Sequence, residues 1–230
     1  MTPEEINRIL EIPQWDTTSS VKTVEARFIY DLVRQNNLSR TLETGFAFGR
    51  SAANIIAASE KQHIAMDPYQ DRYKNLGLEN IKKLGLEGKL DFRRDFSHNV
   101  MPELVKQAQK FDFIFIGGDH KFDGIFIDFY YSDLLLKTGG FVLFHDTWMR
   151  STRLVGKFIK SNRKEYTFIK TPLRNLSLFQ KTGEDTRDGM FFREFYTARS
   201  LLIHSLIRWM TGNRNNFIKR ILLKVKDLVK

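Results

Sequence analysis

The residues from Thr41 to Ser51, which read T-L-E-T-G-F-A-F-G-R-S, combine types and a spacing that suit a nucleotide-like ligand. An apolar run ends at Glu43, two glycines follow at Gly45 and Gly49, and an apolar helical pattern begins after Ser51. Glycines accept positive φ and let a ligand approach the backbone closely. The spacing E-x-G-x-x-x-G differs from the dinucleotide pattern and from the phosphate loop, whose second glycine is followed by a lysine. A carboxylate here suits a ligand with hydroxyl and ammonium donors, and a purely structural turn is the alternative.

Polar side chains also follow four later apolar runs of the chain. They are Asp67, the pair 94–95, the group 117–120 and the pair His145-Asp146. In an open α/β sheet, ligands bind beyond the carboxyl ends of the strands, where the strand order reverses. We therefore expect these side chains and the glycine turn to surround one site.

The elements that position these residues are predicted to alternate between strand and helix. Apolar runs predict strands ending at Glu43 and over 62–66, 90–93, 111–116, 141–144, 166–169 and 176–180. Amphipathic or capped segments predict helices over 2–10, from 17–20 to about 36, from 51, and over 71–84, 97–110, 125–136 and 151–162. This alternation predicts an α/β fold with a doubly wound, mostly parallel, seven-stranded sheet and helices on both faces.

The composition narrows the class of protein. The 230 residues fit one large domain, or one domain with an appendage, and 42% hydrophobic residues are ample for a packed core. The chain has no Cys, which removes disulfides, zinc–thiolate sites and cysteine nucleophiles and fits a reducing cytosol. It has no basic start followed by an apolar stretch, and no run approaches the ~20 apolar residues of a membrane span. We therefore expect a cytoplasmic protein.

The net charge of +10 is concentrated in the last part of the chain. Residues 197–230 hold eight Lys or Arg and one Asp. From Phe217 onward, apolar residues fall on one helical face with lysines opposite, which is typical of a helix that lies on a membrane surface or docks to a partner. We expect a domain over 1–182 and a basic helical extension over 183–230. The extension either contacts a membrane peripherally or packs on its own domain or on a second copy of the chain.

Four stretches, taken in order, resemble a known family. They read L-E-T-G-F-A-F-G-R-S at 42–51, I-A-M-D-P at 64–68, F-D-F-I-F-I-G-G-D-H at 111–120 and G-G-F-V-L-F-H-D-T at 139–147. Over about residues 17–182 the chain resembles class I S-adenosylmethionine-dependent methyltransferases, and more narrowly the small O-methyltransferases of the catechol and caffeoyl-CoA type and their bacterial relatives. The resemblance implies a Rossmann-like methyltransferase fold and transfer of a methyl group to a hydroxyl of a small molecule or glycan.

The resemblance also implies S-adenosylmethionine as cofactor and assigns the residues that hold it. Glu43, Gly45, Gly49 and Ser51 would line the methionine end. Asp67 would accept hydrogen bonds from both ribose hydroxyls. Three consecutive residues would surround the adenine: Asp95, Phe96 and Ser97. Asp67 and Ser97 could instead cap the segments that follow them.

At the catalytic end the chain departs from the family. Metal-dependent members carry Asp directly after the fourth strand and Asp-Asn after the fifth, around magnesium, whereas this chain has Gly117 and Asp146-Thr147. His120 falls where the family has a lysine general base, and an imidazole suits that role near neutral pH. The resemblance therefore assigns catalysis to His120 and Asp146, with His145 orienting Asp146 or the substrate.

The use of a metal is left open by these residues. Asp119 and Asp146 are candidate ligands of a divalent cation, and His120 and His145 could complete a set that favours a transition metal over magnesium. The alternative is a site without a metal, because Asp146 alone is a poor cage for magnesium. Trp148 either forms a wall of the acceptor pocket or packs in the core.

Two other functions are compatible with parts of the sequence. Asp67 lies about twenty residues after the glycine turn, as in an NAD-dependent oxidoreductase, although the glycine spacing and the lack of a second domain argue against that function. Gly117 would suit a non-catalytic cofactor-binding module that docks through its basic extension. The fourth strand does not end in the N-P-P-Y type of sequence of amino-group methylases, so methylation of a nucleic-acid base is not expected. The basic extension leaves an RNA substrate as an alternative.

Overall fold

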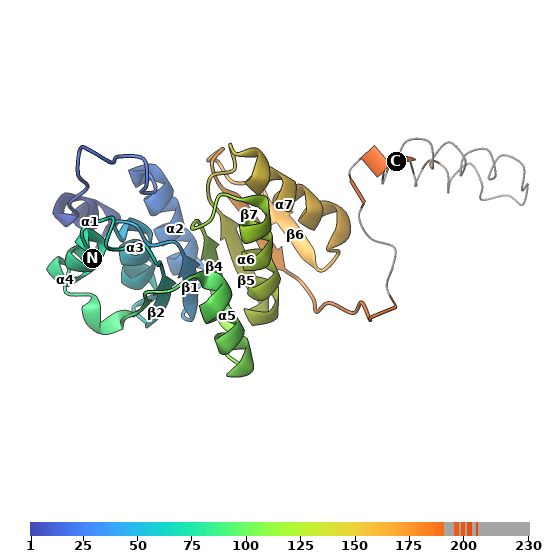
Figure 1. Cartoon of the computed structure of the whole chain (residues 1–230), viewed down its shortest axis with the longest axis horizontal. Coiled ribbons are helices and arrows are strands. Elements are labelled where there is room, and N and C mark those ends of the chain that lie inside the picture. The colour runs from blue at the N-terminus through green and yellow to red at the C-terminus, as the bar shows by residue number, and fades with distance from the viewer. Residues whose placement is uncertain (191–195, 198, 201, 204–205, 207–230) are drawn as a thin grey trace, which may run out of the picture.

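The computed structural model describes residues 1–190, 196–197, 199–200, 202–203 and 206 (Figure 1). The predictions for the extension, including its amphipathic helix and its membrane or partner contacts, therefore lie outside the described residues apart from these few positions. Within the described ranges, no helix has the length and apolar character needed to cross a bilayer. The domain boundary at 182 stays a prediction.

Strands and helices alternate along the described chain, as predicted. The helices are α1 (Pro3–Ile9), α2 (Thr23–Gln35), α3 (Arg50–Ser59), α4 (Leu76–Lys83), the short 3₁₀ turn η1 (Glu87–Lys89), α5 (Ser97–Lys106), α6 (Phe122–Leu135) and α7 (Arg150–Asn162). The strands are β1 (Thr41–Thr44), β2 (His63–Met66), β3 (Leu90–Arg93), β4 (Phe111–Ile116), β5 (Leu136–Phe144), β6 (Tyr166–Ile169) and β7 (Ser177–Lys181).

The strands form one seven-stranded sheet in the order β3-β2-β1-β4-β5-β7-β6. The first five strands are parallel, whereas β7 runs antiparallel to both β5 and β6. This confirms the predicted doubly wound, mostly parallel sheet. The strand order reverses between β1 and β4, so a ligand site is expected beyond the carboxyl ends of these two strands.

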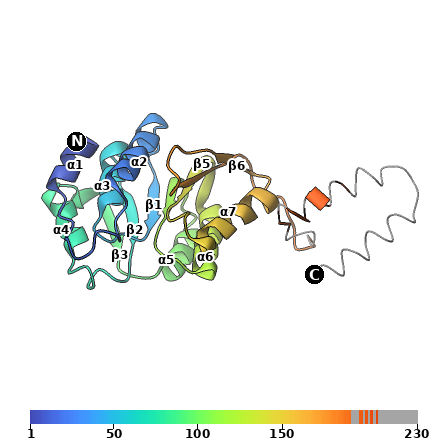
Figure 2. The same ribbon diagram turned by 90° about the horizontal axis from the view of Figure 1, so that it is seen from above.

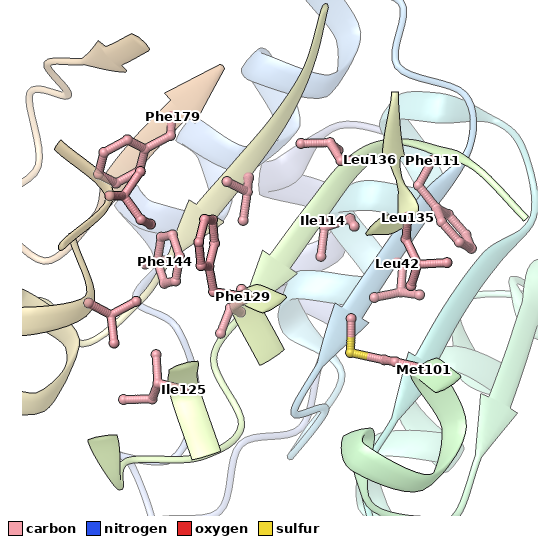
Figure 3. Close-up of a cluster of buried hydrophobic side chains, with 14 of the residues drawn as sticks. Leu42, Met101, Phe111, Ile114, Ile125, Phe129, Leu135, Leu136, Phe144 and Phe179 are labelled. Atoms are coloured by element: carbon pink, nitrogen blue, oxygen red, sulfur yellow. The ribbon is translucent and has the colours of Figure 1, made fainter. Parts of the chain in front are cut away.

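Helices cover both faces of the sheet because the side chains of each strand alternate between them. In β4, Phe113 and Phe115 pack toward α2 and α3, whereas Ile114 and Ile116 pack toward α5, α6 and α7. Figures 1 and 2 show α2 and α3 on the side of β1 opposite to α5 and α6. Figure 3 shows part of the α5–α7 face, where the rings of Phe129, Phe144 and Phe179 meet at centroid distances of 5.9 and 6.2 Å.

Local hydrogen bonds explain where the first two helices begin. Thr2 caps α1 and forms a reciprocal capping box with Glu5, as its sequence predicts. The predicted start of the next helix at 17–20 is wrong, because the Asp16 carboxylate accepts hydrogen bonds from Thr18 and Ser19 and holds a turn there. The helix α2 starts at Thr23 instead, leaving residues 18–21 free to line the cavity described below.

Ion pairs and hydrogen bonds of buried residues connect β6 and β7, at one edge of the sheet, to the rest of the domain. Arg163 is 5% exposed and pairs with Asp133 and Glu165, and Tyr166 donates a hydrogen bond of 2.7 Å to Asp133. The Lys181 ammonium donates to the Asp133 carbonyl at 2.9 Å. These contacts fix β7 beside β5, which in turn positions the loop before β7 next to the end of β5.

Candidate active site

A cavity of about 510 Å³ opens where the strand order reverses, at the carboxyl ends of β1, β2, β4 and β5. Its size lies in the range of sites for small molecules and cofactors. Its walls come from residues 18–21, 44–47, 66–69, 96–98, 117–121 and 145–146. Of the predicted site residues, Gly45, Ser51, Asp67, Phe96, Ser97, Asp119, His120, His145 and Asp146 line the cavity, whereas Glu43, Gly49 and Asp95 do not.

The two glycines of the turn have different roles. Gly45 has a φ of +84°, and a Cβ at this residue would lie 2.5 Å from the Cα of Gly118 after β4. The backbones of the two turns therefore touch and form the floor of the cavity. Gly49 has a φ of +76° and is the N-cap of α3, where a Cβ would lie 3.0 Å from the Gly77 carbonyl oxygen. Gly49 thus packs the start of α3 against α4 and does not line the cavity in this structure, so its assignment to the methionine end stays a prediction.

Glu43 does not line the cavity in this structure either, and its place at the methionine end of the cofactor stays a prediction. Its side chain is fully buried inside the sheet, where Oε1 lies 3.7 Å from Nε2 of His63. The strand continues for one residue past Glu43, because Thr44 still pairs with Met66 and Ile116. Thr44 therefore lines the cavity, while Glu43 points elsewhere.

Asp67 lines the cavity, but most of its acceptor capacity is already used. Its Oδ2 accepts hydrogen bonds from the backbone N–H groups of Phe46 and Ala47 and from the Gln70 amide, at 2.9 to 3.3 Å. Its Oδ1 accepts one hydrogen bond, of 2.7 Å, from the Tyr69 N–H. A carboxylate offers about four acceptor positions. With about two of these positions on each oxygen, Oδ2 is filled and Oδ1 retains one for a ribose hydroxyl, and the assignment of both ribose hydroxyls to Asp67 stays a prediction.

An aromatic group stands at the predicted adenine position. The rings of Phe96 and His98 stack at 5.1 Å, and Tyr69 meets Phe96 edge-on at 5.7 Å. Ser97 opens α5 beside them and lines the cavity. Asp95 instead lies outside, where its carboxylate accepts hydrogen bonds from the Phe96 N–H and the Asn99 amide. Asp95 thus holds the backbone and the Asn99 side chain at the start of α5, and its assignment to the adenine stays a prediction.

The predicted catalytic residues meet at the other end of the cavity. Oδ2 of Asp146 lies 3.1 Å from Nε2 of His120 and 3.0 Å from Nδ1 of His145. Its Oδ1 accepts a hydrogen bond of 3.0 Å from the Trp148 indole. The His120 ring is half exposed, whereas His145 is mostly buried. Asp146 thus joins both histidines.

A fourth charged group, Glu25 of α2, completes this cluster. Glu25 Oε2 lies 3.0 Å from Nε2 of His145 and accepts a hydrogen bond of 2.7 Å from the Lys22 N–H. The Asn175 amide donates to Glu25 Oε1 at 3.1 Å. Nothing in the sequence pointed to Glu25, because 120 residues separate it from His145.

The pKa values of the cluster follow from these contacts. Burial alone would lower the pKa of His145, but its hydrogen bonds to Asp146 and Glu25 outweigh burial and raise it to about 9. Burial alone would raise the pKa of Glu25, but His145, Lys22 and Asn175 lower it to about 2. The two histidines hold the pKa of Asp146 well below its usual range against the effect of burial. The hydrogen bond to Asp146 raises the pKa of His120.

These shifts predict how stability depends on pH. The charge of His145 stabilises the fold fully below its unfolded pKa of about 6.5, and this contribution is lost as the pH rises through about 9. We expect the free energy of unfolding to fall by on the order of 2 kcal/mol between pH ~6.5 and ~9.5. Urea unfolding at several pH values checks this, with His145→Gln as the comparison. An equal decline in both proteins would contradict the assignment.

The donor set does not fit a divalent cation. Both oxygens of Asp146 and both ring nitrogens of His145 already have partners, and the Thr147 hydroxyl donates to the Arg174 carbonyl at 2.6 Å. Asp119 accepts a hydrogen bond from the Lys121 N–H. Across the described ranges no three His, Cys, Asp or Glu side chains come together in a geometry for a metal. The predicted pair Asp119 and Asp146 therefore does not form a metal site in this structure.

Two further side chains were not assigned from the sequence. Arg50 lines the cavity next to Ser51, donates a hydrogen bond of 2.7 Å to the Val21 carbonyl, and has a buried Nε with no partner among the described residues. Among the described residues this guanidinium has no carboxylate partner, and burial lowers its pKa. Trp148 is 67% exposed beside Asp146, so it does not pack in the core.

The fold and the position of the site define the chain as having the Rossmann-like fold of methyltransferases. Similar solved structures include the O-methyltransferase TomG from Streptomyces achromogenes in complex with SAM (TM-score 0.63, 16% identity, covering 79% of this chain and 88% of that chain). Another is the O-methyltransferase from Bacillus cereus in complex with SAH (TM-score 0.62, 16% identity, covering 78% and 90%). At this identity the likeness shows the fold alone.

Residues 6–179 match the profile of the O-methyltransferase family, and the chain belongs to this family. It is 31% identical over 126 residues to caffeoyl-CoA O-methyltransferase 1 of Eucalyptus globulus, covering 51% of this chain and 50% of that protein. It is 33% identical over 100 residues to caffeoyl-CoA O-methyltransferase of Medicago sativa, covering 41% and 40%. The chain thus spans about half the length of the curated relatives that it matches or less. These similarities give no support to the nicotinamide alternative.

Proposed function

We propose that this chain is an S-adenosylmethionine-dependent methyltransferase that transfers a methyl group to a hydroxyl of a small molecule or glycan. The observation that supports this most is the placement of the His120–Asp146 pair at one end of a cavity whose other end carries an aromatic group. The cavity can therefore hold a cofactor along its length and present an acceptor to a base. Family membership supports the same reaction.

The cavity residues fit the cofactor part by part. Arg50 is a partly buried cation without a carboxylate, and buried charges are normally paired. Its guanidinium and Ser51, at the start of α3, suit the methionine carboxylate, which the helix dipole also favours. Asp67 Oδ1 suits a ribose hydroxyl, and Phe96 with His98 suits the face or edge of the adenine.

The chain would contribute a base and its orientation to the reaction. When bound, S-adenosylmethionine supplies an activated methyl group on a sulfonium. Asp146 accepts the hydrogen bond from Nε2–H of His120, which leaves Nδ1 as the basic nitrogen, with no partner in the described part of the chain. Nδ1 takes the proton of the acceptor hydroxyl as the oxygen is methylated, and Asp146 stabilises the resulting imidazolium. The exposed Trp148 indole offers the acceptor a flat apolar surface beside this base.

The acceptor class and any assembly are part of the proposal. We propose that the acceptor is a small molecule or a glycan hydroxyl and that nucleic acid is not a substrate. Residues 197–230 would contact a membrane peripherally or mediate self-association, and liposome sedimentation with and without these residues tests the membrane contact. Equal pelleting of both chains would remove the membrane contact.

Cofactor binding gives a direct test with a variant. In isothermal titration, the wild-type chain is expected to bind S-adenosylmethionine, and Arg50→Gln to bind it about 10- to 100-fold more weakly, because a charge-assisted hydrogen bond to the carboxylate is lost. Decarboxylated S-adenosylmethionine is the matched ligand, and Arg50→Gln should change its affinity by less than about threefold.

The titrations with the two ligands distinguish failure of the proposed function from failure of the role assigned to Arg50. No heat of binding with the wild-type chain at millimolar S-adenosylmethionine would remove the proposed function. An equal loss for both ligands would keep the cofactor and remove the assigned role of Arg50. Transfer is then measured as S-adenosylhomocysteine release with panels of hydroxylated acceptors, and transfer to amines alone would overturn the proposed reaction.

A further inference from the structure

The mostly buried His145 lies between two carboxylates that come from distant parts of the chain. Its Nδ1 lies 3.0 Å from Asp146, and its Nε2 lies 3.0 Å from Glu25 of α2. The Asn175 amide nitrogen also lies 3.0 Å from Nε2. The pKa values of Glu25 and Asp146 are both lowered, so both carboxylates are ionised and can only accept hydrogen bonds, and each ring nitrogen of His145 therefore carries a proton. The ring is therefore an imidazolium, which is a fixed positive charge within the protein. Its side chain is only 10% exposed, so water screens this charge weakly.

Glu25 is built to hold this cation. Its side chain is 4% exposed, and its carboxylate receives the Lys22 N–H at 2.7 Å and the Asn175 amide at 3.1 Å. Two neutral donors and one cation therefore orient the carboxylate before any ligand binds. Burying such a group unpaired would be costly, so the arrangement depends on all its partners.

This ion pair acts on Asp146 in the way that a bound cation would. His145 neutralises part of the Asp146 charge and fixes Oδ2, the same oxygen that faces His120 at 3.1 Å. The other oxygen is fixed by Trp148 at 3.0 Å. The carboxylate thus has a set orientation and a compensated charge, although the surrounding donors do not fit a divalent metal.

We propose that Glu25 is a positioning residue that, together with His145, replaces a divalent cation in holding Asp146 and, through it, the base His120. This rests on the proposed function for the role of the base. The ion pair itself is a property of the resting protein. Two groups of measurements therefore follow, one on the resting protein and one on the reaction.

The first measurement asks whether the site takes a metal. The full chain is stripped with a chelator and titrated with Mn²⁺ while the free ion is followed by electron paramagnetic resonance. We expect no stoichiometric binding at Mn²⁺ concentrations up to about ten times that of the protein, and an unchanged rate of transfer in excess chelator. Stoichiometric Mn²⁺ binding that is lost in Asp146→Asn would overturn the proposal.

The second measurement uses Glu25→Gln, which keeps the shape of the side chain and removes its charge. In ¹⁵N-resolved imidazole spectra near pH 8, His145 should change from doubly protonated to a neutral ring, and the His120 signals should shift. Asp31→Asn is the control, because Asp31 lies on the same helix with its side chain 46% exposed. Unchanged His145 spectra in Glu25→Gln would overturn the proposal without any need for activity.

The third measurement separates positioning from stability. For the proposed reaction, Glu25→Gln should lower kcat about 10- to 100-fold while KM for S-adenosylmethionine stays within about twofold. Asp31→Asn should change neither value. A normal kcat in Glu25→Gln would overturn the role of the ion pair, as would a parallel loss of cofactor affinity. If no acceptor is methylated by the wild-type chain, the proposed function fails, whereas the Mn²⁺ and imidazole results still decide on the ion pair.

Discussion

Asp146→Asn is expected to lower the rate of methyl transfer by about 10²- to 10⁴-fold, because the proposed base His120 loses the acceptor that positions it, and a positioned general base contributes about this factor. The amide would donate toward Nε2 or His145 and so remove the acceptor that fixes the proton on Nε2 of His120. The His120 pKa, which Asp146 raises, should also fall, so that the remaining activity persists to lower pH.

Single-turnover rates with saturating S-adenosylmethionine measure this effect, and calorimetry checks that cofactor affinity changes by less than about threefold. Asp71→Asn serves as the matched control, since that carboxylate is 80% exposed and pairs with Arg94 outside the cavity. A rate for Asp146→Asn within tenfold of the wild type would remove the His120–Asp146 pair from the mechanism.

Gly45→Ala is expected to have the largest effect on the folded state. The added Cβ would lie 2.5 Å from Gly118 Cα in a residue whose φ is +84°. Overpacking against rigid backbone and an unfavourable φ each cost about 1 to 3 kcal/mol, so the free energy of unfolding should fall by about 3 kcal/mol or more. Separation of the two turns would also distort the floor of the cavity and abolish cofactor binding.

Urea unfolding and calorimetry test this prediction against a control of the same chemistry. Gly139 has a φ of +92°, and no atom lies within 4 Å of the position that a Cβ would take there, so Gly139→Ala carries only the cost of the backbone conformation. That variant should lose about 1 kcal/mol and keep its cofactor affinity. Equal losses in the two variants would show that the close approach of Gly45 to Gly118 contributes nothing.

Much of the fold could be predicted because its strands are short apolar runs with clear ends. The strand at 111–116 was predicted with its observed bounds, since F-D-F-I-F-I is buried on both faces. The helix expected from 71 begins only at Leu76, because Lys74 and Asn75 adopt positive φ and form turns before it. Local turns set the residue at which a helix starts, and the amphipathic periodicity of the sequence does not indicate such turns.

The sequence predicted the site residues that directly follow the carboxyl end of a strand. His120, His145 and Asp146 follow strand ends and do come together. Glu43 does not line the cavity in this structure because β1 continues to Thr44, and a shift of one residue moves a side chain to the other face of the sheet. Glu25, Arg50 and Asn175 could not be found, because their roles arise from contacts between segments far apart in the chain.

The charged cluster also sets the order in which the site can be completed during synthesis. Glu25 leaves the ribosome 120 residues before His145, and its partner Asn175 follows 150 residues after Glu25. The glycine turn, Asp67 and the aromatic group of Phe96 are all made within the first half of the 150 residues between Glu25 and Asn175. A nascent chain can therefore assemble the cofactor end of its pocket first, while Glu25 is left without its cation. The catalytic array closes last, and a chain cut short before Asn175 would leave it unfinished.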